Sequence, residues 1–106
     1  TPSYARAVNK KSATKTATIV DSKNQVIATC SITAQFSYSG TISGCTSVSH
    51  STSISNKNWK FTTAKSSRYG NTATGEFTCE HFVAGISAKK ISRTLTLSCS
   101  ASGVIQ

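Results

Sequence analysis

The sequence predicts an all-β fold, a single-domain, antiparallel, Ig-like β-sandwich of about six to seven strands. Segments in which apolar and polar residues alternate recur along the chain, and such alternation is typical of strands with one buried face. Turn-forming Gly, Asn, Asp and Ser residues separate these segments. No segment shows the period of an amphipathic helix, and no internal repeat is present. A small β-barrel is the alternative architecture.

The first 15 residues are basic and show little apolar periodicity. We interpret residues 1–15 as a flexible basic N-terminal arm and residues 16–106 as the β-sandwich domain. A short strand is predicted over 16–20. The polar residues 21–24 are turn formers and should lead into the next strand.

The longest alternating segment runs over residues 25–39. Its polar positions carry Ser, Thr or Gln, and one apolar residue, Ile27, is out of register. This pattern predicts one long strand with a buried face and a solvated face. The predicted buried face consists of Val26, Ala28, Cys30, Ile32, Ala34, Phe36 and Tyr38.

Residues 39–40, Ser-Gly, follow this strand as a candidate for a tight two-residue hairpin turn. The return strand contains Ile42, Cys45 and Val48, which do not share one parity. A β-bulge shifts the parity of a strand, so we expect a bulge near Gly44.

The second half of the chain continues the β pattern. Residues 49–55 are mostly Ser, with a Thr, a His and an Ile among them, which predicts a loop or a fully solvated edge. A strand follows over 59–63, where Trp59 is expected to be a buried anchor. The remaining elements are predicted as a polar basic loop over 65–71 and strands over 72–83 and 86–101, the last interrupted on its apolar face by Arg93.

The composition indicates a small domain with anionic partners. The chain has 106 residues, of which 37% are hydrophobic, so its core is thin and would benefit from covalent links. Twelve basic residues against three acidic ones give a net charge of +9. Such a charge favours nucleic acid, teichoic acid, acidic glycans or anionic lipid, although specific nucleic-acid recognition is not expected. No apolar run approaches the roughly 18 residues of a membrane span.

The four cysteines predict disulfides in an oxidising compartment. Their number is even and no Cys-x-x-Cys pair occurs, which argues against a zinc site or a redox motif. The sequence begins at Thr1 and contains no methionine. We therefore expect a secreted protein whose signal peptide has been removed.

Two of the three possible disulfide connectivities survive a test of strand register. If the first hairpin turns at residues 39–40, Cys45 lies opposite Ala34, and Cys30 is about 13 Å away along its strand. Disulfides require Cα atoms within about 7 Å, so a bond between Cys30 and Cys45 is disfavoured. The second hairpin separates Cys79 from Cys99 in the same way. The connectivities that remain are Cys45–Cys99 with Cys30–Cys79, and Cys30–Cys99 with Cys45–Cys79.

Several short strings carry a resemblance to known proteins. These are AQFSYSG at 34–40, CTS at 45–47, Trp59, GNTATG at 70–75 and LTLSCSASG at 95–103. From residue 16 onward the chain resembles a group of small secreted, uncharacterised β-rich proteins of Gram-positive (Firmicutes) bacteria. The resemblance implies a bond between Cys45 and Cys99, and therefore a second between Cys30 and Cys79, two cysteines that depart from the usual pattern of the group.

No catalytic constellation is apparent, so we do not expect an enzyme. Asp21 is the sole aspartate and lies in a predicted turn, where it cannot complete a Ser-His-Asp triad. Glu76 and Glu80 share one face of a strand with Cα atoms about 13 Å apart. Paired glycosidase carboxylates lie about 5–9.5 Å apart. His81 has the parity of the buried face and is interpreted as a core or rim residue. No cofactor or metal site is predicted.

Basic residues with an aromatic neighbour are the better functional signal, because such patches bind phosphate-rich polymers. We predict a secreted, non-catalytic binding protein for an anionic cell-surface or extracellular polymer. The alternative is a secreted antimicrobial or toxin-like protein that acts on competitor cell envelopes. The candidate binding residues form two groups, Lys57, Lys60, Lys65, Arg68 and Tyr69 in the first, and Lys89, Lys90 and Arg93 in the second.

Overall fold

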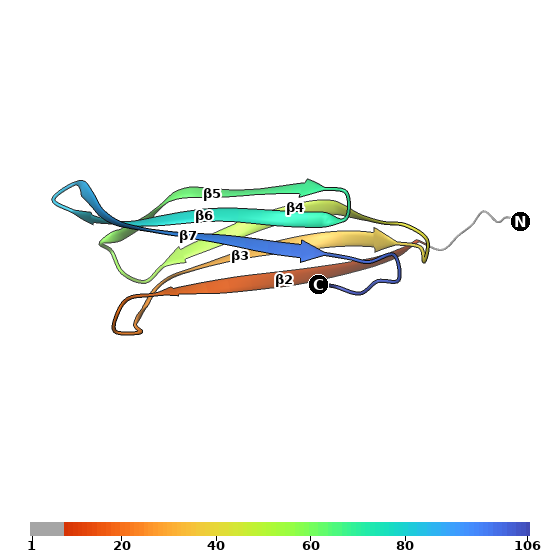
Figure 1. Ribbon diagram of the computed structural model, residues 1–106, viewed down its shortest axis with the longest axis horizontal. Helices are drawn as coiled ribbons and strands as arrows, with labels where there is room; N and C mark the ends of the chain where they lie inside the picture. Colours follow the sequence, from red (N-terminus) through yellow and green to blue (C-terminus); the bar gives the residue numbers. More distant parts are fainter. Residues whose placement is uncertain (1–7) are drawn as a thin grey trace, which may run out of the picture.

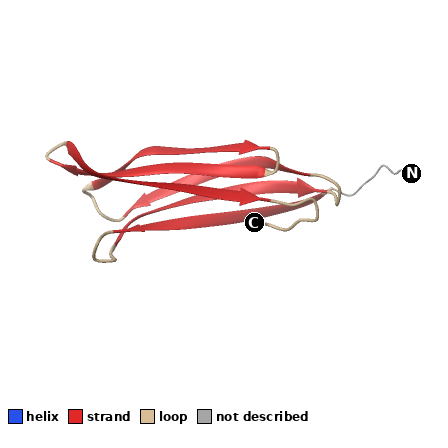
Figure 2. Cartoon of the chain, in the orientation of Figure 1, coloured by secondary structure: helices blue, strands red, loops and turns tan. Residues whose placement is uncertain are grey.

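A computed structural model of the protein describes residues 8–106, which contain six β-strands and no helix (Figures 1 and 2). The predicted all-β class is therefore confirmed. The described part of the chain accordingly holds no helix that could cross a membrane. The strands are β2 (Asn9–Val20), β3 (Val26–Tyr38), β4 (Ser43–Ile54), β5 (Trp59–Tyr69), β6 (Thr72–Val83) and β7 (Ile86–Ser98).

The six strands form two antiparallel sheets of three strands each, in the orders β2-β3-β4 and β5-β6-β7. Each sheet is a meander of consecutive strands, and the two pack into a slab of 67 × 22 × 14 Å (Figure 1). The Ig-like part of the prediction is not met, because Ig domains connect their two sheets through Greek-key crossovers. Here one connection, between β4 and β5, joins the sheets.

The core lies between the two sheets and is built from the alternating residues of the central strands. Ile32 and Phe36 of β3 face Phe77 of β6, and Leu95 of β7 packs beside them. All four side chains are buried. The sandwich is therefore held by the period-2 pattern that the sequence displays, since each strand presents its apolar parity inward.

A β-bulge explains why the apolar residue Ile27 breaks the alternation of the longest predicted strand. Ile19 pairs with Ala28, and Val20 pairs with Val26, which leaves Ile27 as an extra residue in β3. As a result Ile27 is fully buried, whereas Val26 is 48% exposed. The prediction that Val26 lies on the buried face was wrong, because the parity of β3 shifts at this bulge.

The first hairpin turn is longer than predicted. Residues 39–42 form the loop, and the amide of Ser39 donates a hydrogen bond of 3.0 Å to the carbonyl of Ile42. Cys45 consequently pairs with Phe36 rather than with Ala34. Between Cys45 and Ser47 one residue has no partner in the ladder, so the bulge expected near Gly44 lies at Thr46.

Three polar segments belong to the sheets, the first as one of its two predicted alternatives, a solvated edge, and the other two against the prediction. Residues 49–54 continue β4 as an exposed edge strand, and residues 65–69, predicted as a loop, are the second half of β5. β2 begins at Asn9, so residues 9–15 of the predicted arm pair with β3, and residues 1–7 lie outside the described part of the chain. Backbone pairing with a neighbouring strand stabilises these segments, and their polar side chains face solvent.

The prediction of two disulfides is not supported. All four cysteines are buried, free thiols. The Cys45 thiol donates to the carbonyl of Ser47 at 3.3 Å, and the Cys99 thiol donates to the carbonyl of Ser100 at 3.4 Å. In this structure the four side chains act as small core residues that fill space between the sheets.

Burial should protect these thiols from reagents. It raises the pKa of the Cys30, Cys45 and Cys79 thiols above the ordinary value of 9.0, and a thiol reacts only as its thiolate. We expect iodoacetamide at pH 8 to leave the folded protein unmodified and to modify all four cysteines in urea, as measured by intact mass. Fewer than four modified cysteines in urea would show that disulfides form and would contradict the structure.

Three turns meet at each end of the slab. We call the end with residues 39–42, 70–71 and 99–106 the proximal end, and the end with turns 21–25, 55–58 and 84–85 the distal end (Figure 1). The proximal end is tied across the sheets by backbone hydrogen bonds. The amide of Cys45 donates to the carbonyl of Gly70 at 2.8 Å, and the amide of Gly40 donates to the carbonyl of Ala101 at 2.8 Å.

Candidate functional site

The two predicted groups of basic residues lie on one sheet but on its two edge strands. β5, with the turn before it, carries the first group, β7 carries the second, and β6 lies between them. In the ladder, Lys60 and Lys90 both pair with Glu80 of the central strand. Lys57, Lys60, Lys89 and Lys90 all lie at the distal end, but Lys89 pairs with His81 and projects from the opposite face of the sheet to Lys60 and Lys90.

The structure separates Arg68 and Tyr69 from this group. Tyr69 is the last residue of β5, beside the 70–71 turn at the proximal end, and is 90% exposed. The Arg68 guanidinium donates a hydrogen bond of 3.1 Å from Nη1 to the carbonyl of Cys45. Arg68 thus links β5 to β4 across the two sheets, which is a structural role.

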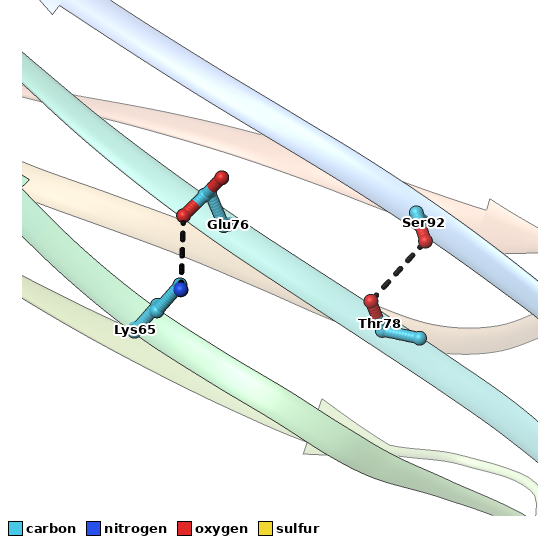
Figure 3. Close-up of polar contacts among 4 residues, drawn as sticks. All are labelled: Lys65, Glu76, Thr78 and Ser92. Atoms are coloured by element: carbon cyan, nitrogen blue, oxygen red, sulfur yellow. Dashed lines mark hydrogen bonds and ion pairs between the residues drawn. The ribbon is translucent and has the colours of Figure 1, made fainter.

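Lys65 and Arg93 lie along the middle of the sheet and have partners of their own. Lys65 Nζ lies 3.4 Å from Glu76 Oε2, and both side chains are more than half exposed (Figure 3). Such a surface ion pair stabilises the fold by at most about 1 kcal/mol. Figure 3 also shows the neighbouring hydrogen bond between Thr78 and Ser92, which joins β6 to β7. Arg93 Nη1 donates to the carbonyl of Ser92 at 2.9 Å.

Lys23, which was not among the predicted binding residues, also lies at the distal end. Lys23 lies in the 21–25 turn, next to Asp21. The pKa of Asp21 is lowered, first by hydrogen bonds from the amides of Gln25 and Lys23 and further by the charges of Lys23 and Lys89. β7 belongs to the other sheet, but Lys89 lies near its start, at the same end of the slab as this turn. We call Lys23, Lys57, Lys60, Lys89 and Lys90 the distal lysine cluster.

The distal lysine cluster retains a net positive charge. Two carboxylates lie near it, Asp21 and Glu80, against five lysines. A hydrogen bond of 2.6 Å from Ser87 Oγ to Glu80 Oε1 is the main cause of the lowered pKa of Glu80, and the charge of Lys90 adds to it. Between residues 8 and 106, the ion pair of Lys65 and Glu76 is the one salt bridge present, so none of the five lysine ammonium groups is neutralised by direct pairing.

A shallow hollow of about 440 Å³ opens between two of these lysines. It is lined by Lys57, Asn58, Lys60, Phe82 and Gly85. The amide of Phe82 donates to the carbonyl of Asn58 at 2.9 Å, which holds the 55–58 turn against β6. The hollow thus combines ammonium groups with an aromatic ring on a braced backbone.

Beneath this surface the indole of Trp59 stacks on the ring of His81, with centroids 5.0 Å apart and planes inclined by 24°. Trp59 is 7% exposed, which confirms it as a buried anchor. His81 is half-buried, in the rim position that its parity indicated. This pair fixes the start of β5 and so the position of Lys60.

No second candidate site is found among the described residues. No three His, Cys, Asp or Glu side chains among residues 8–106 gather as metal ligands. Glu76 pairs with Lys65, and Glu80 accepts a hydrogen bond from Ser87, both on the solvent face of β6. The distal lysine cluster is the feature best suited to recognition, because clustered, unpaired ammonium groups attract polyanions.

Comparisons with known proteins bear on the fold. No protein-family model and no curated protein matches the sequence. A solved structure that is similar is the 2.75 Å crystal structure of the hypothetical protein lmo2686 from Listeria monocytogenes EGD-e. The two share 17% sequence identity and a TM-score of 0.57, over 89% of this chain and 72% of that chain. The protein therefore shares its β-rich fold with a hypothetical protein of a Gram-positive bacterium.

Proposed function

We propose that this protein is a secreted, non-catalytic binding protein that holds an anionic polymer of a cell surface through the distal lysine cluster. One observation carries the proposal. Five lysines from three separate segments of the chain converge at one end of the slab, and none of them has a carboxylate within ion-pairing distance in the described structure. The secreted location rests on the resemblance to secreted Gram-positive proteins.

The chemistry of the cluster fits a repeating anion better than a single small one. Each ammonium group is exposed and flexible, so it contributes little alone. A polymer with closely spaced phosphates releases several counterions when it contacts several lysines at once. Binding of this kind weakens steeply as salt rises, and it does not require a deep pocket.

Removal of the cluster charges should weaken retention on a phosphate polymer. We expect the variant Lys57→Gln/Lys60→Gln/Lys89→Gln/Lys90→Gln to elute from immobilised poly(glycerol phosphate) at much lower salt than the wild type. Because about one counterion is released for each phosphate contact, the slope of log affinity against log salt should fall by on the order of three.

A control variant of the same net charge separates this site from general basicity. Lys10→Gln/Lys11→Gln/Lys15→Gln/Lys65→Gln also removes four charges, but along the rest of the slab. This control should keep most of the retention. Equal losses in the two variants would show that only the total charge matters, and absence of retention in the wild type would overturn the proposal directly.

A further inference from the structure

The β6–β7 hairpin ends in an apolar tip. Val83 pairs with Ile86 as the last rung of the ladder, and Ala84 and Gly85 form the turn between them. Val83 is 54% exposed and Ile86 is 71% exposed. Four consecutive positions therefore present no polar side chain at an exposed turn.

The backbone conformation of this turn commonly goes with a polar residue at the first turn position, and alanine stands there instead. Ala84 has φ 53° and Gly85 has φ 80°, the conformation of a two-residue turn with both residues left-handed. Asn or Asp commonly occupies the first of these positions, since their side chains tolerate the left-handed region. Alanine here costs conformational energy and keeps the tip apolar.

The tip also projects beyond its surroundings. In Figure 1 the turn between β6 and β7 reaches farther along the long axis than the other two turns of the distal end. Three more exposed apolar residues lie where strands meet those other turns, namely Val20, Val26 and Ile54, each 38–48% exposed.

The distal lysine cluster stands immediately behind this tip. Lys89 and Lys90 follow the tip on β7, and Lys57 and Lys60 share the hollow with Phe82 and Gly85 of the hairpin. Long lysine side chains can lay their methylene stems along apolar surface while the ammonium group reaches anions. The hairpin thus has apolar side chains at its tip and lysines farther back. An anionic bilayer has the complementary order, with phosphates at its surface and hydrocarbon beneath them.

The proximal end has exposed apolar residues too, but two of its cations are held by hydrogen bonds. Ile42 is 72% exposed and Tyr69 is 90% exposed. Lys11 Nζ, however, donates a hydrogen bond of 2.6 Å to the carbonyl of Gly103, and Arg68 donates to the carbonyl of Cys45. Among the described residues, the larger group of lysines without a carboxylate partner lies beside exposed apolar residues at the distal end.

We infer that the distal end docks on an anionic lipid bilayer, with the β6–β7 tip inserted at the level of the acyl-chain boundary and the distal lysine cluster on the headgroup phosphates. The inference rests on the proposed function for the anion-binding role of this cluster, and it goes beyond it by adding a lipid bilayer as a second anionic ligand. The tip runs from Val83 to Ile86, so each arm of the hairpin contributes two residues, which extend about 7 Å. This length matches the shallow depth of interfacial anchors. Deeper entry would carry exposed edge amides into hydrocarbon.

Sedimentation with vesicles tests the inference. The full chain is mixed with vesicles of equal parts phosphatidylglycerol and phosphatidylcholine, or of phosphatidylcholine alone. We expect binding to the anionic vesicles only. Val83→Ser/Ile86→Ser should weaken this binding at least about tenfold, because the exposed parts of both side chains leave water only in the bound state. The control Ile42→Ser/Val104→Ser removes two equally exposed apolar residues near the proximal end and should bind as the wild type does.

The polymer column separates failure of the inference from failure of the proposed function. We expect the tip variant to keep wild-type retention on poly(glycerol phosphate), and its circular dichroism spectrum should match that of the wild type, which shows that it is folded. Wild-type vesicle binding by the tip variant, or polymer retention without any vesicle binding, would overturn the inference and leave the proposed function standing. Absence of both vesicle binding and polymer retention in the wild type would overturn both.

Discussion

Replacing Phe77 with alanine is expected to lower the free energy of unfolding by about 3–5 kcal/mol. Phe77 is the central aromatic residue of the core and is 1% exposed. Its ring meets His50 edge-on at a centroid distance of 6.0 Å and Phe61 at 6.3 Å. Truncation removes the transfer energy of the ring and leaves a cavity between two sheets that share few other large side chains.

This loss is large compared with the total stability of a domain of this size, about 5–15 kcal/mol. Urea unfolding followed by circular dichroism measures it. Phe77→Leu retains most of the apolar volume and provides a folded variant if Phe77→Ala does not fold. The control is Tyr69→Ala, which removes an aromatic ring that is 90% exposed and should change stability by less than about 0.5 kcal/mol. Equal effects of Phe77→Ala and Tyr69→Ala would show that the sheets do not pack as described.

Gly75→Ala is expected to destabilise the protein by about 1–3 kcal/mol, although alanine is the smallest possible addition. A Cβ atom at this position would collide with Cγ2 of Ile32 on the facing sheet and would lie 2.8 Å from Cε2 of Phe77. Gly75 has an ordinary strand conformation, so the effect comes from lack of space. Glycine here allows the two sheets to approach closely.

Gly44→Ala is a matched control, because the nearest atom to its Cβ would be the Gly70 carbonyl oxygen at 3.9 Å, an ordinary contact. We expect Gly44→Ala to be close to neutral. In the double variant Gly75→Ala/Ile32→Ala, the collision with Cγ2 is absent, so the cost of Gly75→Ala should be smaller than in the wild-type background. Additive effects of the two changes in urea unfolding would contradict the assigned contact.

Strands in which apolar and polar residues alternate clearly could be predicted from the sequence. The expected strand over 72–83 coincides with β6, and the expected strand over 25–39 differs from β3 by one residue at each end. Their alternating apolar and polar residues must face opposite sides of a sheet, so the pattern alone indicates extended structure. The second halves of β4 and β5 lack this contrast, because both faces of an exposed edge strand carry Ser, Thr and Lys. Pairing with a neighbour makes them strands.

Proximity in sequence was a poor guide to the candidate site. Lys60 and Tyr69 are nine residues apart on β5, which separates them by about 30 Å in an extended chain. They were grouped as one patch, but they lie at opposite ends of the slab. Lys23 was missed, yet an observable signal existed. In a meander, alternate turns lie at the same end, so the turns 21–25 and 84–85 are placed together once the strands are counted.

The sequence by itself determined the all-β class, the antiparallel strands and the inward parity of the core, because these depend on local alternation. It also determined the net charge. Only the tertiary structure decided the state of the cysteines and the position of the binding surface, because small irregularities change long-range register. The four-residue loop 39–42 moved Cys45 from Ala34 to Phe36, and the stacking of the two sheets placed Lys89 and Lys23 at the same end of the slab.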